Sequence, residues 1–388
     1  MNSNSLICNF IKDNPENWKE LLENDYDLKI KIDNNYAIFN YDFNCNFANP
    51  IVQEARGIII DYKNLEVVCW PFRKFGNHNE SYCDKIDWES ARVLEKVDGS
   101  IIKLWFDFEK NDWQFSTNGT IRAENASVDK YFNLYFMDLI NEAENLKDIP
   151  YDSLDKTNTY IFELVGPRNQ IVVKYPTTAL FHLGTRNNIT GQEMEVDIGI
   201  QKPNSYKLKS LDDCVNAVLN LNKNNSDTIK QEGFVVVDKN YHRIKVKSPE
   251  YLVMSRLSQV TAISKKDCLY LLLNNTQKLE VFGKNNTDLL PSIKYYDYKF
   301  TLLKDMSNKM ALFSRALYRE FDNNRGAVAR IISSHWLSAI GFKALGNEKT
   351  GEEILLEMPF EKLLKLIPDY EAEDLSLLLT KQTNNEEY

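Results

Sequence analysis

The hydrophobic pattern changes near Ser248–Pro249 and divides the chain into two parts. Before this point, short apolar or alternating runs are separated by Asn, Asp and Gly, which is typical of β-strands joined by tight turns. After it, apolar residues recur every three or four positions, which is typical of amphipathic helices. The chain has 388 residues, enough for two domains. We therefore predict an α+β domain over residues 1–250 and an all-helical domain over residues 251–388.

The first part of the chain is dominated by predicted strands. A capping signal at Asn14, followed by apolar residues at helical spacing, predicts a short helix up to Glu23. Apolar residues between Ser127 and about Asn145 recur every three or four positions and predict a second helix. The predicted strands span residues 36–41, 56–61, 67–72, 113–120, 160–167, 171–175, 179–186, 232–238 and 241–247.

A lysine followed at once by a turn signal lies between two β-prone runs. Lys96 precedes Val97-Asp98-Gly99, with residues 91–94 before it and residues 101–106 after it. Because Asp-Gly favours tight turns, we predict a hairpin with Lys96 near its mouth. Taken alone, the motif is more typical of an ordinary surface lysine, since short motifs often match by chance.

Charged residues interrupt several strands that are otherwise apolar. Glu163 lies inside one such run and Glu232 begins another. A charge in a buried strand destabilises the fold unless a group of opposite charge lies nearby, so both carboxylates require partners. Arg56 begins a strand and Lys74 follows one, and cations in such places can also serve to prevent edge-to-edge pairing of sheets.

Three cations alternate along the last predicted strand. Because successive side chains of a strand point to opposite faces, Arg243, Lys245 and Lys247 share one face. Ile244 and Val246 occupy the other face and are predicted to join the core. The cationic face is either solvated or directed at anions.

One polyphosphate site would account for all of these charges together. The cations would neutralise a nucleoside triphosphate, and the carboxylates would position hydrated Mg²⁺. Lys96, crowded by other cations, would have its pKa lowered and could then act as a nucleophile. The chain lacks a glycine-rich loop ending in Lys-Ser/Thr, which argues against a P-loop enzyme.

The combined motifs resemble those of the covalent nucleotidyltransferases, and their full series is similar to the RNA ligase 1 family of bacteriophage T4. Lys96-Val97-Asp98-Gly99 resembles the nucleotidyl-lysine motif that this superfamily shares with ATP-dependent ligases and mRNA capping enzymes. The other matches follow in chain order: Glu54-Ala55-Arg56-Gly57-Ile58, Lys74-Phe75-x-Asn77, Phe162-Glu163-Leu164-Val165-x-Pro167-x-Asn169, Glu232-Gly233-Phe234-Val235 and Lys245-Val246-Lys247-Ser248. The resemblance covers residues 39–251 and extends more weakly into the helical part. It implies a nucleotidyltransferase domain built on antiparallel β-sheets with flanking helices.

The resemblance also implies an ATP-dependent RNA ligase that forms a covalent lysine-AMP. Lys96 would attack the α-phosphate of ATP and release pyrophosphate. The AMP would pass to an RNA 5′-phosphate, and a 3′-hydroxyl would displace it to seal the strand. Arg56 and Lys74 would hold the ATP phosphates or ribose, and Lys245 and Lys247 would neutralise the α-phosphate.

Further contacts are implied by family position. Asp98, Glu163 and Glu232 would hold Mg²⁺, or Mn²⁺ in its place, mostly through water. The other expected nucleotide-binding residues are Phe39, Glu95, Val235 and Tyr251. Asn118 stands where the family has a lysine, and no C-terminal metal contact can be aligned around Gln277.

The second part of the chain contains three apolar stripes at helical spacing. They run from Phe300 to Phe321, from Val328 to Ile340 and from Leu355 to Ile367. Residues 255–345 carry 14 Lys and Arg against 7 Asp and Glu, whereas residues 346–388 carry 4 against 11, so the basic portion could face RNA phosphates. By family resemblance this domain would select the RNA substrate, for example a broken tRNA anticodon loop in tRNA repair.

The overall composition is that of an ordinary globular protein, with 43% apolar and 27% charged residues. The formal charge of -9 argues against wholesale wrapping of nucleic acid. No window approaches the roughly 18 apolar residues of a membrane span, and no secretion signal is recognisable, so we expect a cytoplasmic monomer. The six cysteines and four histidines show no metal-ligand spacing.

Two other classes of protein share parts of this pattern. A DNA ligase or capping enzyme has the same lysine motif, but it would normally continue after Lys247 with a small β-barrel, whereas this chain turns helical. A non-catalytic RNA-binding relative would need no nucleophile. The combination of Lys96 with both strand carboxylates and the two last cations disfavours it.

Overall fold

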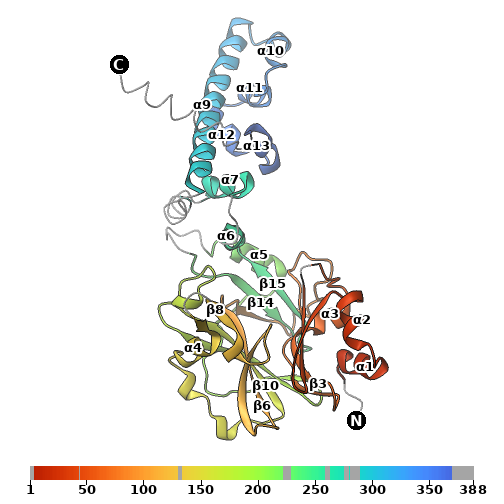
Figure 1. Cartoon of the computed structure of the whole chain (residues 1–388). Coiled ribbons are helices and arrows are strands. Elements are labelled where there is room, and N and C mark those ends of the chain that lie inside the picture. The colour runs from red at the N-terminus through yellow and green to blue at the C-terminus, as the bar shows by residue number, and fades with distance from the viewer. Residues whose placement is uncertain are drawn as a thin grey trace. The chain divides into compact units, whose positions relative to one another are not determined.

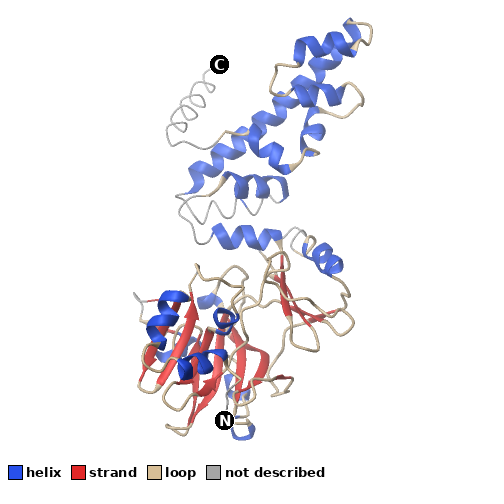
Figure 2. Cartoon of the chain, turned by 90° about the vertical axis from the view of Figure 1, so that its right-hand side faces the viewer, coloured by secondary structure: helices blue, strands red, loops and turns tan. Residues whose placement is uncertain are grey.

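The computed structural model divides the chain into two compact units, Met1–Ser255 and Arg256–Tyr388. It describes residues 4–42, 44–129, 133–221, 229–257, 263–274, 279 and 289–368. All described strands belong to the first unit, and the described elements of the second unit are helices (Figures 1 and 2). The predicted α+β fold class is confirmed.

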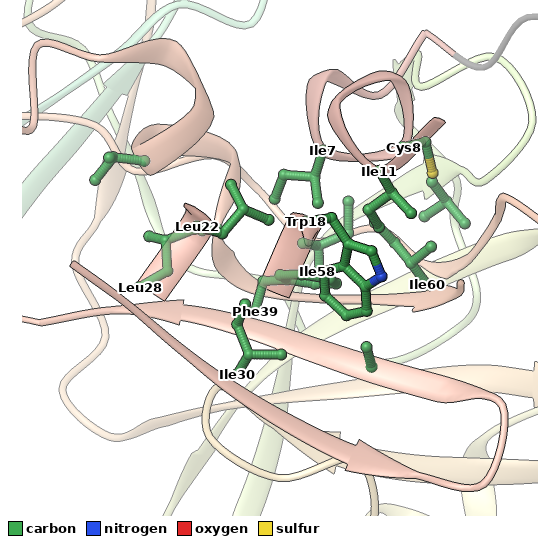
Figure 3. Close-up of a cluster of buried hydrophobic side chains, with 14 of the residues drawn as sticks. Ile7, Cys8, Ile11, Trp18, Leu22, Leu28, Ile30, Phe39, Ile58 and Ile60 are labelled. Carbon is green, nitrogen blue, oxygen red and sulfur yellow. The ribbon is translucent and has the colours of Figure 1, made fainter. Parts of the chain in front are cut away.

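The first sheet has the order β1-β2-β3-β4, and all its pairs are antiparallel. Its strands are β1 (Leu28–Asp33), β2 (Tyr36–Tyr41), β3 (Arg56–Asp61) and β4 (Glu66–Cys69). Three helices accompany it: α1 (Leu6–Asp13), α2 (Trp18–Asp25) and α3 (Pro50–Glu54). Apolar side chains from helices and strands form one core, in which Trp18 packs on Phe39 with ring centres 5.8 Å apart (Figure 3). This core fixes the start of β3, and with it Arg56.

Two further antiparallel sheets complete the scaffold of the first unit. One has the order β12-β11-β10-β6-β7, with β12 (Glu193–Met194), β11 (Ala179–Asn187), β10 (Asn158–Val165), β6 (Ser100–Asp107) and β7 (Asp112–Thr117). The other has the order β13-β5-β14-β15, with β13 (Ser205–Tyr206), β5 (Arg92–Glu95), β14 (Gly233–Val237) and β15 (Arg243–Lys247). Helix α5 (Leu211–Val218) packs on β14 and β15.

The predicted hairpin around Asp98-Gly99 is wrong, because β5 and β6 belong to different sheets. Strand β5 pairs with β14, and the Lys96 N–H donates to the Gly233 carbonyl. Strand β6 pairs with β10, with Ser100 opposite Leu164. A Cβ atom at Gly99 would collide with the Leu164 carbonyl, so glycine allows the close crossing. The segment after Lys96 therefore carries the chain from one sheet to the next.

Two other local predictions in the first unit are also wrong. The helix predicted over residues 127–145 begins only at α4 (Phe136–Asn141), after the short strands β8 (Ser127–Asp129) and β9 (Leu134–Tyr135). Asn133 has a φ of 50°, which is incompatible with a continuous right-handed helix. Tyr131 and Phe132, which contributed to the predicted stripe, lie outside the described residues. Residues 171–175 form no strand, because the N–H groups of Val172 and Val173 donate to the Asp98 carboxylate instead.

A short helix, α6 (Pro249–Leu257), leads into the second unit. That unit contains α7 (Lys265–Asn274), α9 (Leu290–Glu320), α10 (Arg325–Ile332), α11 (Ser338–Ala344), α12 (Gly351–Leu356) and α13 (Phe360–Leu366). The long predicted helix is confirmed as α9. The stripe over residues 328–340 is divided between α10 and α11, and the stripe over residues 355–367 is divided between α12 and α13. Pro359, which caps α13, separates the latter two helices. No helix in the described parts of the chain is long and apolar enough to span a membrane.

The apolar stripe predicted for α9 is only half buried. Phe300, Leu303 and Met310 lie in the core, but Phe313 is 51% exposed. Small residues, among them Ser307, Ala311 and Ser314, take other buried positions of this helix. A Cβ atom at Gly351 would collide with the Ser307 carbonyl, so α12 approaches α9 more closely than large side chains would allow.

Candidate active site

A cavity of about 1460 Å³ lies in the first unit, with lining residues from β5, β14 and β15 and from β6, β10 and β11. Many of the residues singled out in the sequence line it. They are Arg56, Glu95, Lys96, Asn118, Glu163, Val235, Arg243, Lys245 and Lys247. The separate charged positions of the sequence therefore do meet in one place.

Glu232 does not itself line the cavity, but it holds two of the lining lysines together. One carboxylate oxygen lies 2.8 Å from Lys96 Nζ, and the other lies 2.9 Å from Lys247 Nζ. The Glu232 side chain is only 3% exposed, so the three groups form an ion-paired cluster largely shielded from water. Glu232 is placed for this role because it immediately precedes β14, the strand that pairs with both β5 and β15.

The expectation that neighbouring cations lower the pKa of Lys96 is wrong. Burial does lower it, but the negative charges of Glu232 and Glu163 outweigh burial, so the pKa of Lys96 is raised above its ordinary value. Lys96 is therefore an ammonium group at neutral pH before any ligand binds. It must transfer a proton before it can act as a nucleophile.

The carboxylate of Glu163 faces the same cavity from β10. Its Oε1 accepts a hydrogen bond from the Gly99 N–H at 3.1 Å, which links it to the segment that follows Lys96. Burial raises the pKa of Glu163 to about 7, against the opposing effect of Lys96. A cation entering the cavity would favour the ionised form of this carboxylate.

Lys245 and Arg56 both lie near the same aromatic ring. The Lys245 ammonium lies 5.2 Å from the centre of the Phe75 ring, and the Arg56 guanidinium lies 5.1 Å from it. Burial, followed by the charges of Arg56 and Lys74, lowers the pKa of Lys245 to about 7. The lowered lysine pKa expected at this site therefore belongs to Lys245.

The structure also explains how Lys245 is placed. Its N–H donates to the Gly76 carbonyl, and its own carbonyl accepts from the His78 N–H. These bonds join β15 to the segment that carries Phe75. The predicted alternation along β15 is confirmed, since Ile244 and Val246 are buried in the core.

Asp98 and Tyr251 do not line the cavity. One Asp98 oxygen accepts from the N–H groups of Val172 and Val173 at 2.9 and 2.7 Å. The other accepts from the Tyr251 hydroxyl at 2.7 Å. Both oxygens are thus engaged by the protein, and the two residues hold the segment after Lys96 in place.

Phe39 and Lys74 are also directed away from the cavity lining. Phe39 is fully buried in the core of the first sheet. The Lys74 ammonium lies 4.2 Å from the centre of the Phe47 ring and 4.7 Å from that of Tyr41. Asn118 does line the cavity, and its buried Oδ1 has no hydrogen-bond partner among the described residues. Gln277, near the expected C-terminal metal contact, lies outside the described residues.

Sequence reasoning missed part of this site. Phe75 lies inside the motif Lys74-Phe75-x-Asn77, but only the spatial meeting of β3 and β15 gives its ring two cations to hold. Arg243, which shares a strand face with Lys245, stacks on Phe72 at 4.2 Å and forms an ion pair with Glu193 at 2.6 Å. Its charge is therefore already paired within the cavity wall.

Residues 54–251 match a family model described as RNA ligase, that of bacteriophage T4 RNA ligase 1, over about half of the chain. The chain belongs to this RNA ligase family. All the cavity residues named above lie within the matched range. The family membership predicted from the sequence motifs is thereby confirmed.

Individual relatives of this chain agree with the family assignment. A protein of Autographa californica nuclear polyhedrosis virus, named "Putative bifunctional polynucleotide kinase/RNA ligase", is 32% identical over 257 residues, which is 59% of this chain and 35% of the relative. An RNA ligase of Rhodothermus phage RM378 is 23% identical over 345 residues, which is 73% of this chain and 76% of the relative. The chain spans about a third of the length of the viral relative and of a second one from Ostreid herpesvirus 1.

Solved structures resemble this chain only distantly. The match to an archaeal ATP-dependent RNA ligase includes 63% of this chain and 63% of the archaeal chain, with 11% sequence identity and a TM-score of 0.40. Similarity of this size adds nothing to the family assignment.

Proposed function

We propose that this protein seals RNA 5′-phosphate and 3′-hydroxyl ends in an ATP-dependent reaction through a lysine-AMP on Lys96. The observation that carries the proposal is the ion-paired cluster of Lys96, Glu232 and Lys247, set in a cavity with Glu163 and Lys245. A binding protein needs no such buried lysine. A covalent nucleotidyltransferase needs a nucleophile, a place for its proton and cations for the phosphates.

In the first step, Lys96 Nζ forms a bond to the α-phosphorus of ATP, and the bond from that phosphorus to the bridging oxygen breaks to release pyrophosphate. Lys96 must first lose a proton, and its hydrogen bond to Glu232 Oε2 offers a route for it. An RNA 5′-phosphate oxygen then takes the AMP from Lys96. Finally, a 3′-hydroxyl oxygen attacks the activated 5′-phosphorus and AMP leaves.

The cations of the cavity would bind and stabilise the phosphates. Lys245 and Lys247 would face the α-phosphate, and Arg56 would hold the β- and γ-phosphates or the ribose. Lys74 would add charge nearby, consistent with its electrostatic effect on Lys245. Preorganised cations at a transferring phosphate stabilise the charge of the transition state.

The side chains fit a divalent cation that keeps most of its water. Glu163 offers a carboxylate at the cavity, whereas the oxygens of Glu232 and Asp98 already have partners. Within the described residues, no three His, Cys, Asp or Glu side chains form a metal-binding group. Mg²⁺ or Mn²⁺ would therefore be held by Glu163, water and the nucleotide phosphates, and would neutralise phosphate charge.

The two units would have different functions. Residues 1–250 would act as the adenylyltransferase domain, and the helical residues 251–388 would select the RNA, with a broken tRNA as the favoured substrate of a cytoplasmic, monomeric repair enzyme. The excess of Lys and Arg in residues 255–345 supports an RNA-facing role.

A sealing assay tests the proposed function. Single-stranded RNA, a tRNA cleaved in its anticodon loop and a nicked duplex, each with 5′-phosphate and 3′-hydroxyl ends, are incubated with ATP and Mg²⁺. We expect joined product from at least one RNA, with cleaved tRNA reacting fastest, and none from matched 5′-hydroxyl substrates. If no joined or AMP-capped product forms from any of them, the protein is not a ligase. Joining of a nicked DNA duplex alone would identify a different ligase class.

A further inference from the structure

The cavity extends well beyond the group around Lys96. A second portion is lined by Trp88, Arg92, Lys202, Lys207 and Lys209, which we call the distal arm. Arg92 and Lys96 lie on the same run of chain, four residues apart, and a strand rises about 3.3 Å per residue. The part of the arm at Arg92 therefore lies roughly 13 Å from Lys96, which is farther than the triphosphate of an ATP attacked by Lys96 would reach.

Strand β13 lies in the chain between Lys202 and Lys207 of the arm. It pairs with β5, with Ser205 opposite Leu94 and Tyr206 opposite Val93. Tyr206 packs on Phe234 with ring centres 4.9 Å apart, so its face of the strand belongs to the core. Lys207, the next residue, is exposed and lines the cavity.

The cavity is lined by nine Lys and Arg against five Glu, and the lysines of the arm supply positive charge that is not ion-paired within the described part of the chain. Lys202, Lys207 and Lys209 are exposed, and none of them has an ion pair within 4.0 Å among the described residues. By contrast, Lys96 and Lys247 share Glu232, and Arg92 pairs with Glu195. Three lysines unpaired among the described residues, and the net positive lining of the cavity, favour the binding of a polyanion there.

We propose that the distal arm binds backbone phosphates of the RNA strand whose 5′ end is activated at Lys96. The inference rests on the proposed function and extends it to a second binding site. A single strand entering the cavity would place its terminal phosphate near Lys96 and its following phosphates along the lysines. Trp88, which is partly exposed in the arm, adds an aromatic surface on which a base can stack.

The test compares Lys207→Ala/Lys209→Ala with Lys63→Ala/Lys110→Ala. The control removes the same charge from exposed positions that do not line the cavity. Lysine-AMP formation from ATP alone and transfer of AMP from the pre-labelled protein to 5′-phosphorylated RNA are measured separately in single turnovers. We expect the arm variant to need about tenfold more RNA for half-maximal transfer. A plot of log affinity against log salt concentration should be less steep for this variant by about 1.4, since each lost phosphate contact removes about 0.7. The control should behave as wild type.

Two results would overturn the proposal. One is an RNA dependence equal to that of the control, and the other is a defect that appears equally in the ATP-only step, which would place the lysines in the nucleotide site. Binding of a fluorescent 5′-phosphorylated RNA, followed by anisotropy, applies even if the protein forms no lysine-AMP. In that case, weaker RNA binding by the arm variant than by wild type would still support RNA binding at the distal arm, and equal binding would refute it. Only the missing lysine-AMP would count against the proposed function.

Discussion

Replacing Lys245 with methionine is expected to lower the rate constant of lysine-AMP formation by about 10²- to 10³-fold, equivalent to roughly 2.7–4 kcal/mol of transition-state stabilisation. Lys245 is held over Phe75 beside Arg56, inside the cavity that contains Lys96. Its charge would meet the α-phosphate in a setting largely shielded from water, where electrostatic effects are strong. Rapid-quench kinetics with labelled ATP measures the loss.

Lys245 should also give ATP binding a defined pH dependence. In the free protein its pKa is lowered to about 7, so the side chain becomes neutral as the pH rises above 7. Phosphate binding favours the charged form of Lys245 and raises its pKa, so ATP binding above pH 7 should be accompanied by uptake of a proton. The affinity for ATP should therefore weaken above pH 7, by up to about tenfold per pH unit. Calorimetry in buffers of different ionisation enthalpy measures this proton uptake.

Lys245→Arg is the matched variant for the pH effect. Arginine keeps the positive charge at every accessible pH, so proton uptake attributable to this position should disappear. Proton uptake of the same size in Lys245→Arg and wild type would assign the titration to another group.

Replacing Glu232 with glutamine should lower the rate constant of lysine-AMP formation by about 10²-fold. Glutamine keeps the size of the side chain but removes the charge that holds Lys96 and Lys247 at 2.8 and 2.9 Å. Two ammonium groups would then lie side by side without a counterion, and Lys96 would lose its orientation and the acceptor for its proton. The pKa of Lys96 would fall, and each unit by which it falls gives at most about tenfold more of the free amine. We expect the loss of the correct position of Lys96 to have the larger effect on the rate.

Single-turnover rates across a range of pH test this balance. Glu232→Gln should remain slow at every pH, and Glu232→Asp, which keeps the charge but shortens the side chain, should also be slow. A Glu232→Gln rate within about fivefold of wild type would show that the carboxylate is not needed to position Lys96.

The sequence indicated the chemical groups of this site better than their arrangement. The alternation along β15 follows from the two-residue period of a strand, and the burial of Ile244 and Val246 confirms it. The carboxylates of Glu163 and Glu232 were recognisable because a charge in an apolar strand requires a partner. These inferences depend only on local pattern.

Long-range pairing was not predictable from local pattern. The turn signal at Asp98-Gly99 suggested a hairpin, but β5 finds its partner in β14 and β6 finds its partner in β10. The raised pKa of Lys96 has the same origin, because β14 brings Glu232 to it from far along the chain. Phe39 reads as an aromatic strand residue in the sequence, and only its packing on Trp18 shows that it belongs to the core.

The most direct test of this account is covalent labelling of Lys96. The protein is incubated with ATP labelled at the α-phosphate and Mg²⁺ at several pH values, denatured, and digested to locate the label. We expect one acid-labile AMP on the peptide that contains Lys96, no label on Lys96→Ala, and full labelling of the exposed control Lys110→Ala. A wild-type protein that stays unlabelled at every pH, or a Lys96→Ala variant that still carries the label, would contradict the assignment of Lys96 as the nucleophile.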